Sequence, residues 1–178
     1  MQYEQVVNAC RETFLQKTTD YGTSWRVLRI ISVADQILIK AQRIRTIQER
    51  GTRRVADPIA AEFLGIVNYA IIGLMQLDLD DARVDDLAVD AVEPLWQRQV
   101  DNARALMLDK NHDYGEAWRD MSQESLADLI LVKVLRIRQI LANDGRTLVS
   151  EGVDANFTDI LNYAAFALIL IGEGKHPS

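Results

Sequence analysis

Charged side chains lie in a largely apolar stretch of the second half of the chain. Residues 126–141 read LADLILVKVLRIRQIL and include Asp128, Lys133 and Arg136. At about 100° per residue on a helix, Lys133 and Arg136 lie about 140° and about 80° from Asp128, so all three share one half of the helix. Charged groups are seldom buried unless they are paired or bound to a ligand. These three side chains are therefore candidates for binding chemistry.

A second apolar stretch carries a polar stripe at helical spacing. Asn156, Asp159 and Asn162 follow one another every three residues, a step that drifts by about 60° around a helix. If the two stripes face each other, they form a cleft of acids, cations and amides that suits a polyanionic ligand, with or without a divalent metal. The alternative is a buried structural network that fixes how the helices pack.

The same residue types recur earlier in the chain. Between 17–47 and 110–140, sixteen of thirty-one aligned positions are identical without a gap, and the match resumes after a shift of one residue. The matching residues that could do chemistry are Lys17 and Lys110, Asp20 and Asp113, Tyr21 and Tyr114, Trp25 and Trp118, Asp35 and Asp128, Lys40 and Lys133, Arg43 and Arg136, and Asn68 and Asn162. The chain therefore contains two copies of one unit.

The two copies differ in their acids. The first has Glu62 and Gly65 where the second has Asn156 and Asp159. Each copy therefore lacks one carboxylate that the other keeps. Either one site has decayed, or the two copies complement each other.

Each copy carries the motif Lys-x-x-Asp-Tyr-Gly-x-x-Trp. Its glycines, Gly22 and Gly115, are expected to end a helix in the left-handed conformation. We expect the tyrosine and the tryptophan to pack this turn onto the helices. The motif lysines, one turn earlier, can reach a phosphate, and the aspartates can cap the next segment. For the lysines and the aspartates, a structural and a binding role both remain open.

The elements that position these residues are predicted to be helices. Long apolar segments, with Gly51 and Gly145 just beyond two of their ends, predict three helices in each copy. The predicted helices are 2–17, 33–48, 60–77, 96–110, 126–141 and 155–171; only 146–150 has any strand character. We therefore predict an all-α fold in which two three-helix units pack around a pseudo-twofold axis. A solenoid is the alternative, but two copies are too few to stack stably.

The acidic groups concentrate between the two copies. Residues 78–93 contain seven acids and one arginine, while the 178-residue chain has a net charge of −6. We divide the chain into a first unit, 1–77, an acidic linker, 78–93, and a second unit, 94–178. An acidic chain does not favour binding to duplex nucleic acid, which needs clustered Lys and Arg.

Composition also indicates where the protein works. The single cysteine, Cys10, suits a reducing compartment. The most apolar run, 160–171, is shorter than the roughly 20 residues that cross a bilayer. We expect a soluble, cytoplasmic protein that does not enter a membrane.

Three strings together resemble a known family. They are KNHDYGEAW, LADLILVKVLRIRQI and VDANFTDILNYAAFAL, and they look like the nucleotide modification associated domain type 1, in its tandem-duplicated form. Similar short motifs occur in proteins that resemble the all-α nucleoside triphosphate pyrophosphohydrolases, the MazG and dimeric dUTPase superfamily. The resemblance implies a MazG-like helical bundle.

The same resemblance implies a metal site. Those enzymes bind Mg²⁺ through acids on two helices and cut between the α- and β-phosphates. The second acidic motif falls on Asn156 and Asp159, and the first falls near Asp128, where the second acid is missing and Lys133 lies nearby. The metal ligands implied in this way are Asp128 and Asp159 and, in the first copy, Asp35 and Glu62.

The resulting hypothesis is a nucleotide-binding protein, with Mg²⁺-dependent pyrophosphohydrolysis as its activity. The alternative is a non-catalytic binding or regulatory module with degenerate sites. The catalytic candidates are Asp128, Asp159 and Lys133. The substrate-binding candidates are Lys110, Asp113, Tyr114, Trp118, Arg136, Asn156 and Asn162 in the second copy, and Lys17, Lys40, Arg43, Glu62 and Asn68 in the first. The expected partner is a small-molecule nucleotide, and a homodimer of the whole chain is left open.

Overall fold

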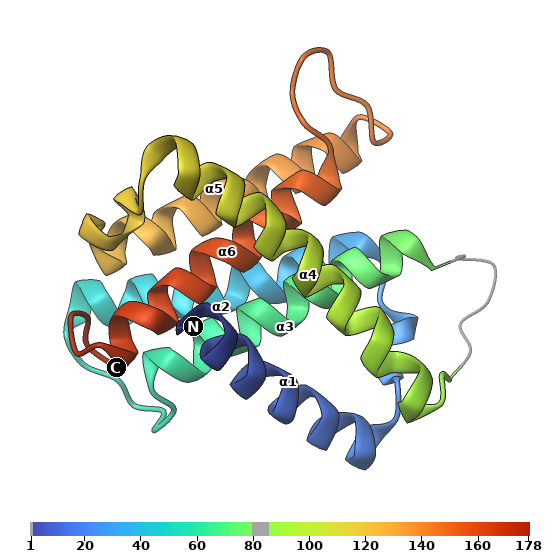
Figure 1. The fold of residues 1–178 in the computed structure, drawn as a ribbon, viewed down its shortest axis with the longest axis horizontal. Coiled ribbons are helices and arrows are strands. Elements are labelled where there is room, and N and C mark those ends of the chain that lie inside the picture. Colours follow the sequence, from blue (N-terminus) through green and yellow to red (C-terminus); the bar gives the residue numbers. More distant parts are fainter. Residues whose placement is uncertain (1, 80–85) are drawn as a thin grey trace.

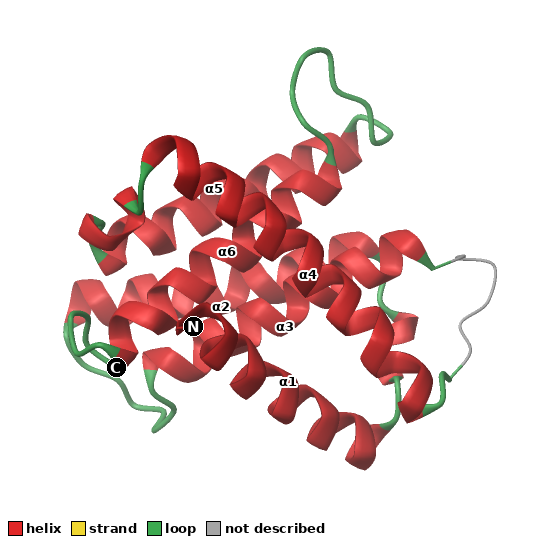
Figure 2. Cartoon of the chain, in the orientation of Figure 1, coloured by secondary structure: helices red, strands yellow, loops and turns green. Residues whose placement is uncertain are grey.

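The fold is all-helical, as the sequence predicts. The structure, a computed structural model, describes residues 2–79 and 86–178, and no strand occurs among them. The helices are α1 (Gln2–Tyr21), η1 (Ser24–Val27), α2 (Ile30–Arg50), α3 (Ile59–Asp78), α4 (Val89–Tyr114), η2 (Ala117–Asp120), α5 (Gln123–Ala142) and α6 (Val153–Gly172), where η marks a short 3₁₀ helix (Figure 1). Long loops separate α2 from α3 and α5 from α6 (Figure 2).

The helices form three layers of two. The central layer is α3 with α6; α2 and α5 pack on one side of it, and α1 and α4 cross the other side. Each layer therefore contains one helix from each repeat. The two repeats share a single core and do not form separate bodies.

The central position of α3 and α6 follows from their composition. Both helices are apolar around most of their circumference, and such helices need burial on several sides. By length and composition each could cross a membrane, but 67% of each apolar window is buried inside the protein. That burial is typical of the core helices of soluble proteins.

Paired contacts between α2 and α5 reveal the pseudo-twofold axis. The Arg45 guanidinium lies 3.6 Å from Asp128, and the equivalent Arg138 lies 3.7 Å from Asp35. The two ion pairs exchange under a rotation that swaps the repeats. They also place Asp35 and Asp128 at the interface between α2 and α5.

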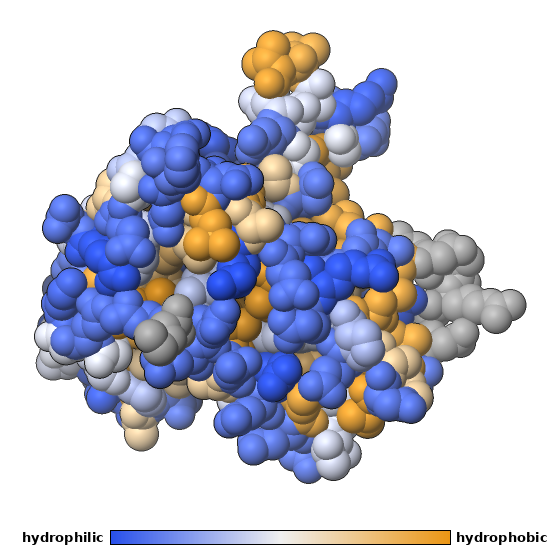
Figure 3. Space-filling model, viewed as in Figure 1, coloured by the Kyte–Doolittle hydropathy of each residue, from blue (hydrophilic) through white to orange (hydrophobic). Residues whose placement is uncertain are grey.

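Several boundaries differ from the sequence prediction. α4 begins at Val89, inside the segment assigned to the acidic linker, and Asp90 lies in its first turn, where the helix dipole favours a negative charge. Residues 80–85 of that linker lie outside the described part. The segment 146–150 forms no strand. Leu148 and Val149 are fully exposed there and form the apolar tip in Figure 3.

Candidate functional site

A pocket of about 520 Å³ opens in the first repeat. Residues from α1, η1, α2 and α3 line this first pocket. Those that carry its chemistry are Lys17, Tyr21, Trp25, Lys40, Asn68 and Tyr69, and Gly65 lies among them. With Phe14, which also lines it, the pocket combines two cations, four aromatic rings and one amide.

The two lysines of the first pocket differ in their ion pairs. Lys17 is exposed and has no ion pair among residues 2–79 and 86–178. Lys40 Nζ lies 3.3 Å from Glu62 Oε2 and 6.0 Å from the centre of the Tyr69 ring. Glu62 is shared, because its other oxygen lies 2.6 Å from Arg43. The pocket therefore retains positive charge that the protein does not fully neutralise.

Two buried polar atoms in the lining of the first pocket have no partner. Asn68 Nδ2 donates to the Cys10 carbonyl at 3.1 Å, but Asn68 Oδ1 has no hydrogen bond among the described residues. The Trp25 ring nitrogen is also without one. Both residues are 8% exposed. Buried polar atoms without a partner are uncommon in proteins, and the Trp118 ring nitrogen of the second repeat is another one in the described part of the chain.

The turn after α1 holds Trp25 in place. Gly22 ends α1 with a φ of 65°, a left-handed conformation that glycine adopts without steric cost. Gln76 on α3 then donates to the carbonyls of Trp25, Arg26 and Leu28 at 3.3, 3.0 and 2.8 Å. Gly115 also has a φ of 65°, but its ψ of −167° lies outside the left-handed helical region.

The second repeat has an equivalent pocket of about 260 Å³. Its lining includes Lys110, Tyr114, Trp118, Asp159, Asn162 and Tyr163. The pseudo-twofold axis therefore relates two pockets of unequal size.

An internal ion-pair network occupies the second pocket. Asp159 Oδ1 lies 3.0 Å from Lys110 Nζ, and Asp159 Oδ2 lies 2.8 Å from Lys133 Nζ. Burial alone would lower the pKa of Lys110, but the hydrogen bond and charge of Asp159 outweigh it and raise the pKa. One carboxylate thus bridges two lysines, as the hypothesis of a structural network describes.

Aromatic packing also reduces the volume of the second pocket. The Trp118 ring stacks on Phe166, with centroids 4.3 Å apart and planes 5° apart, whereas the first pocket has Ile72 in place of Phe166. Asn162 Oδ1 accepts a hydrogen bond from the Tyr3 hydroxyl at 2.8 Å, and burial raises the pKa of Tyr3 above its usual range. This amide oxygen is therefore satisfied by the protein itself.

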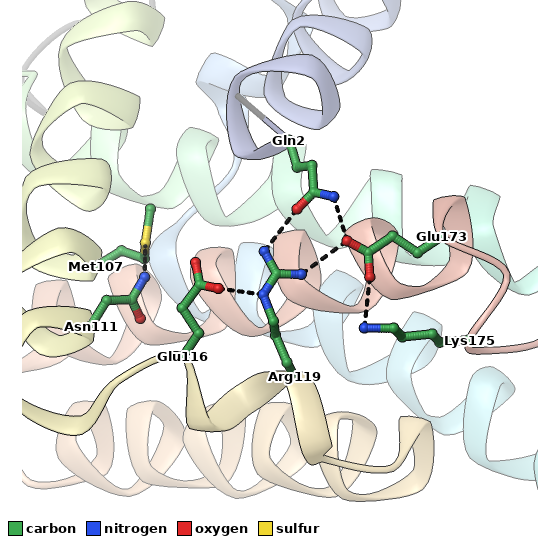
Figure 4. Close-up of polar contacts among 7 residues, drawn as sticks. All are labelled: Gln2, Met107, Asn111, Glu116, Arg119, Glu173 and Lys175. Carbon is green, nitrogen blue, oxygen red and sulfur yellow. Dashed lines mark hydrogen bonds and ion pairs between the residues drawn. The ribbon is translucent and has the colours of Figure 1, made fainter.

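Residues near both ends of the chain contact Arg119, in the turn between α4 and α5. Arg119 Nη1 donates to Glu173 at 2.9 Å, Arg119 Nη2 donates to Gln2 at 2.7 Å, and Arg119 also contacts Glu116 (Figure 4). Its guanidinium lies 4.4 Å from the centre of the Trp118 ring. These contacts hold Trp118 against α6.

The structure brings together part of the predicted site. Lys110, Lys133, Asp159 and Asn162 converge in the second repeat. Their counterparts Lys17, Lys40 and Asn68 line the first pocket. Among the described residues of the first predicted stripe, only Lys133 therefore contacts the second stripe, through Asp159.

Other predicted residues lie apart from the pockets. Asp128 and Arg136 are exposed and line neither pocket, and Asp113 is exposed beside His112, with the two side chains 3.1 Å apart. Asn156 uses its side chain to donate to the Gly152 carbonyl at 2.8 Å. Asp128 points to α2 because it pairs with Arg45.

The tyrosines of the repeated motif do not pack the turn as predicted. Tyr21 and Tyr114 are 71% and 77% exposed, whereas Trp25 and Trp118 are each 8% exposed. The buried tryptophans therefore anchor the two turns, whereas the exposed tyrosines lie at the rims of the two pockets.

Sequence reasoning missed Tyr21, Trp25 and Gly65 as members of the candidate site. The repeat already contained the signal for the first two, since they align with Tyr114 and Trp118. Gly65 was interpreted only as a lost acid, although its missing side chain leaves room for Lys40, whose Cε would lie 2.8 Å from an added Cβ atom.

The carboxylates do not form an open site for Mg²⁺. Asp159 contacts two lysines, and Glu62 contacts Lys40 and Arg43. No cluster of three or more acidic, histidine or cysteine side chains occurs in the described part of the chain. A divalent ion needs oxygen ligands, and cations of the protein already contact these oxygens.

Comparison with known proteins places the chain in a family. The model of "Nucleotide modification associated domain 1" matches residues 17–77 and 110–171, which together are more than half of the chain. The chain belongs to this family. It carries the nucleotide modification associated domain twice, and each copy contains one of the two pockets. No curated protein and no solved structure matches the chain.

Proposed function

We propose that the protein is a nucleotide-binding module and that the first pocket is its ligand site. One observation carries the proposal: Lys17 and Lys40 line the same cavity as the unpartnered polar atoms of Trp25 and Asn68. Lysines attract phosphate, and aromatic rings with a few placed polar groups suit a nucleobase or a sugar. The family description, which refers to nucleotide modification, supports this ligand class.

The geometry favours binding over catalysis. Asp159 and Glu62 are engaged by lysine and arginine, and Asp128 lines neither pocket. Among residues 2–79 and 86–178, no acidic residue lines the first pocket, so the lining offers no carboxylate to activate water or to hold Mg²⁺. We assign the protein a binding or regulatory role in the cytoplasm, with pyrophosphohydrolysis as the competing function that the family resemblance suggests.

Calorimetry with nucleotides tests the assignment. We expect binding to the full chain that does not require Mg²⁺ and that leaves the nucleotide intact. Lys17→Ala and Lys40→Ala should each weaken binding at least tenfold, whereas Lys175→Ala, which removes a lysine that lines neither pocket, should not.

Two results would contradict the assignment. Release of pyrophosphate in the presence of Mg²⁺ would favour the pyrophosphohydrolase. Loss of binding in Lys110→Ala, with Lys17→Ala unaffected, would move the ligand to the second pocket.

A further inference from the structure

The two pockets differ most at one aligned position. Asp159 of the second pocket aligns with Gly65 of the first. A Cβ atom at Gly65 would lie 2.8 Å from Lys40 Cε and 3.1 Å from Lys40 Nζ. The end of the Lys40 side chain therefore packs against Gly65, whereas the second repeat has Asp159 at the aligned position.

In the second repeat a single anionic group contacts both lysines. The two oxygens of Asp159 lie 3.0 Å from Lys110 and 2.8 Å from Lys133. Among the described residues, no acid contacts both members of the equivalent pair in the first repeat, Lys17 and Lys40, because Glu62 pairs with Lys40 and Arg43. A carboxylate and a phosphate both present oxygens to ammonium groups in this manner.

We propose that Asp159 occupies the position that a phosphate of the ligand takes in the first pocket, and that the ligand is a nucleoside monophosphate bound once per chain without metal. This inference rests on the proposed function and narrows it. A phosphate monoester carries about −1.5 to −2 charges at neutral pH, which two lysines balance.

Neighbouring acids disfavour a longer phosphate chain. Glu62 lies 3.3 Å from Lys40 and already engages Arg43 at 2.6 Å. Asp86 lies beside the turn at Gly22, which lines the pocket, and accepts from Thr23 Oγ1 at 3.3 Å. Additional phosphates would add negative charge between these acids without gaining a free cation there, and like charges at short range repel.

The remaining lining suits the neutral part of a nucleotide. Trp25 supplies an unpartnered donor and Asn68 an unpartnered acceptor, which match the polar edge of a base or the hydroxyls of a sugar. Tyr21 is exposed at the rim, where its ring can stack on a base. A volume of about 520 Å³ falls in the usual range for small-molecule sites.

Titration calorimetry on the full chain tests the ligand class. The probes are the four nucleoside monophosphates, the matching triphosphates with and without Mg²⁺, the free nucleosides and inorganic phosphate. We expect one monophosphate to bind with a stoichiometry of one, and its triphosphate and free nucleoside to bind at least tenfold more weakly. Tighter binding of the triphosphate, or two ligands per chain, would overturn the inference while leaving nucleotide binding intact. No binding by any nucleotide would instead overturn the proposed function.

A substitution at Gly65 tests the position of the phosphate. Gly65→Asp supplies the internal acid of the second repeat, so we expect at least a hundredfold loss of monophosphate affinity together with a higher melting temperature. Gly65→Ala controls for the added volume, and Gly172→Asp adds the same charge at a site with open space that lines neither pocket. Wild-type affinity in a folded Gly65→Asp variant, or equal losses in Gly65→Ala, would contradict the assignment.

Discussion

Single buried polar atoms differ between the two pockets. Asn162 Oδ1 accepts from the Tyr3 hydroxyl, but the residue equivalent to Tyr3 is Trp96, and Asn68 Oδ1 has no partner among the described residues. An unsatisfied buried polar group costs about 1–3 kcal/mol. A ligand that donates to Asn68 removes that cost, so binding and stability are coupled in the first repeat.

The pH dependence of stability provides a test at Cys10. Burial raises the pKa of the Cys10 thiol to about 12, whereas a cysteine in an unfolded chain has a pKa of about 8.5. Because the pKa of Cys10 is higher in the folded than in the unfolded protein, the buried neutral thiol contributes its full stabilisation at pH values below the unfolded pKa. This contribution is lost as the pH rises toward the folded pKa. From pH 8 to pH 10 we expect the free energy of unfolding to fall by about 1–2 kcal/mol more in the wild type than in Cys10→Ala.

Chemical denaturation at several pH values checks this expectation. Equal pH slopes for the wild type and Cys10→Ala would contradict it. Since Cys10 is fully buried, a thiol reagent at pH 8 should also label it only when the protein unfolds.

At the level of the helices, one close contact fixes how α3 and α6 pack. Gly73 of α3 faces the Phe157 ring of α6, and a Cβ atom there would lie 2.7 Å from that ring. Phe157 is fully buried and cannot shift freely in a close-packed core. The glycine therefore allows the two central helices to approach each other.

We expect Gly73→Ala to destabilise the protein by about 1–3 kcal/mol, because the added methyl group overpacks the core. Gly172→Ala is the matched control: nothing lies within 4 Å of the added atom, and the lower helix propensity of glycine favours alanine there. Thermal and denaturant unfolding measure both effects. A neutral Gly73→Ala variant would show that α3 and α6 separate easily.

Local sequence predicted the helices better than their packing. Long apolar segments and helix-ending glycines such as Gly22 and Gly51 carry local information, and all six predicted helices are present. The sequence also identified Lys17, Lys40 and Asn68 as candidate site residues, because each aligns with an identical residue in the second repeat. Which pocket is open depends on contacts between distant segments, such as Tyr3 with Asn162, and periodicity does not encode those contacts.

At the level of the whole molecule, neither repeat is complete alone. The central layer pairs α3 with α6, and α1 of the first repeat packs on α6 of the second. Tyr3 and Gln2 of the first repeat also bond to Asn162 and Glu173 of the second. Separating the repeats would expose the most apolar face of each central helix.

We therefore expect residues 1–79 alone to lack a stable monomeric fold, because α3 would lose the surface that buries it. Co-expression with residues 86–178 should restore a cooperative melting transition. Circular dichroism and sedimentation velocity provide the measurements. A folded monomer of residues 1–79 would show that the repeats are independent domains.

The covalent link between the two repeats has an evolutionary consequence. In a dimer of identical chains, every mutation appears in both binding sites, so neither site can change without the other. In this chain Gly65 and Asp159 are encoded separately, and each can mutate without altering its counterpart. Under the proposed function, one half can specialise in holding the scaffold together while the other binds the ligand.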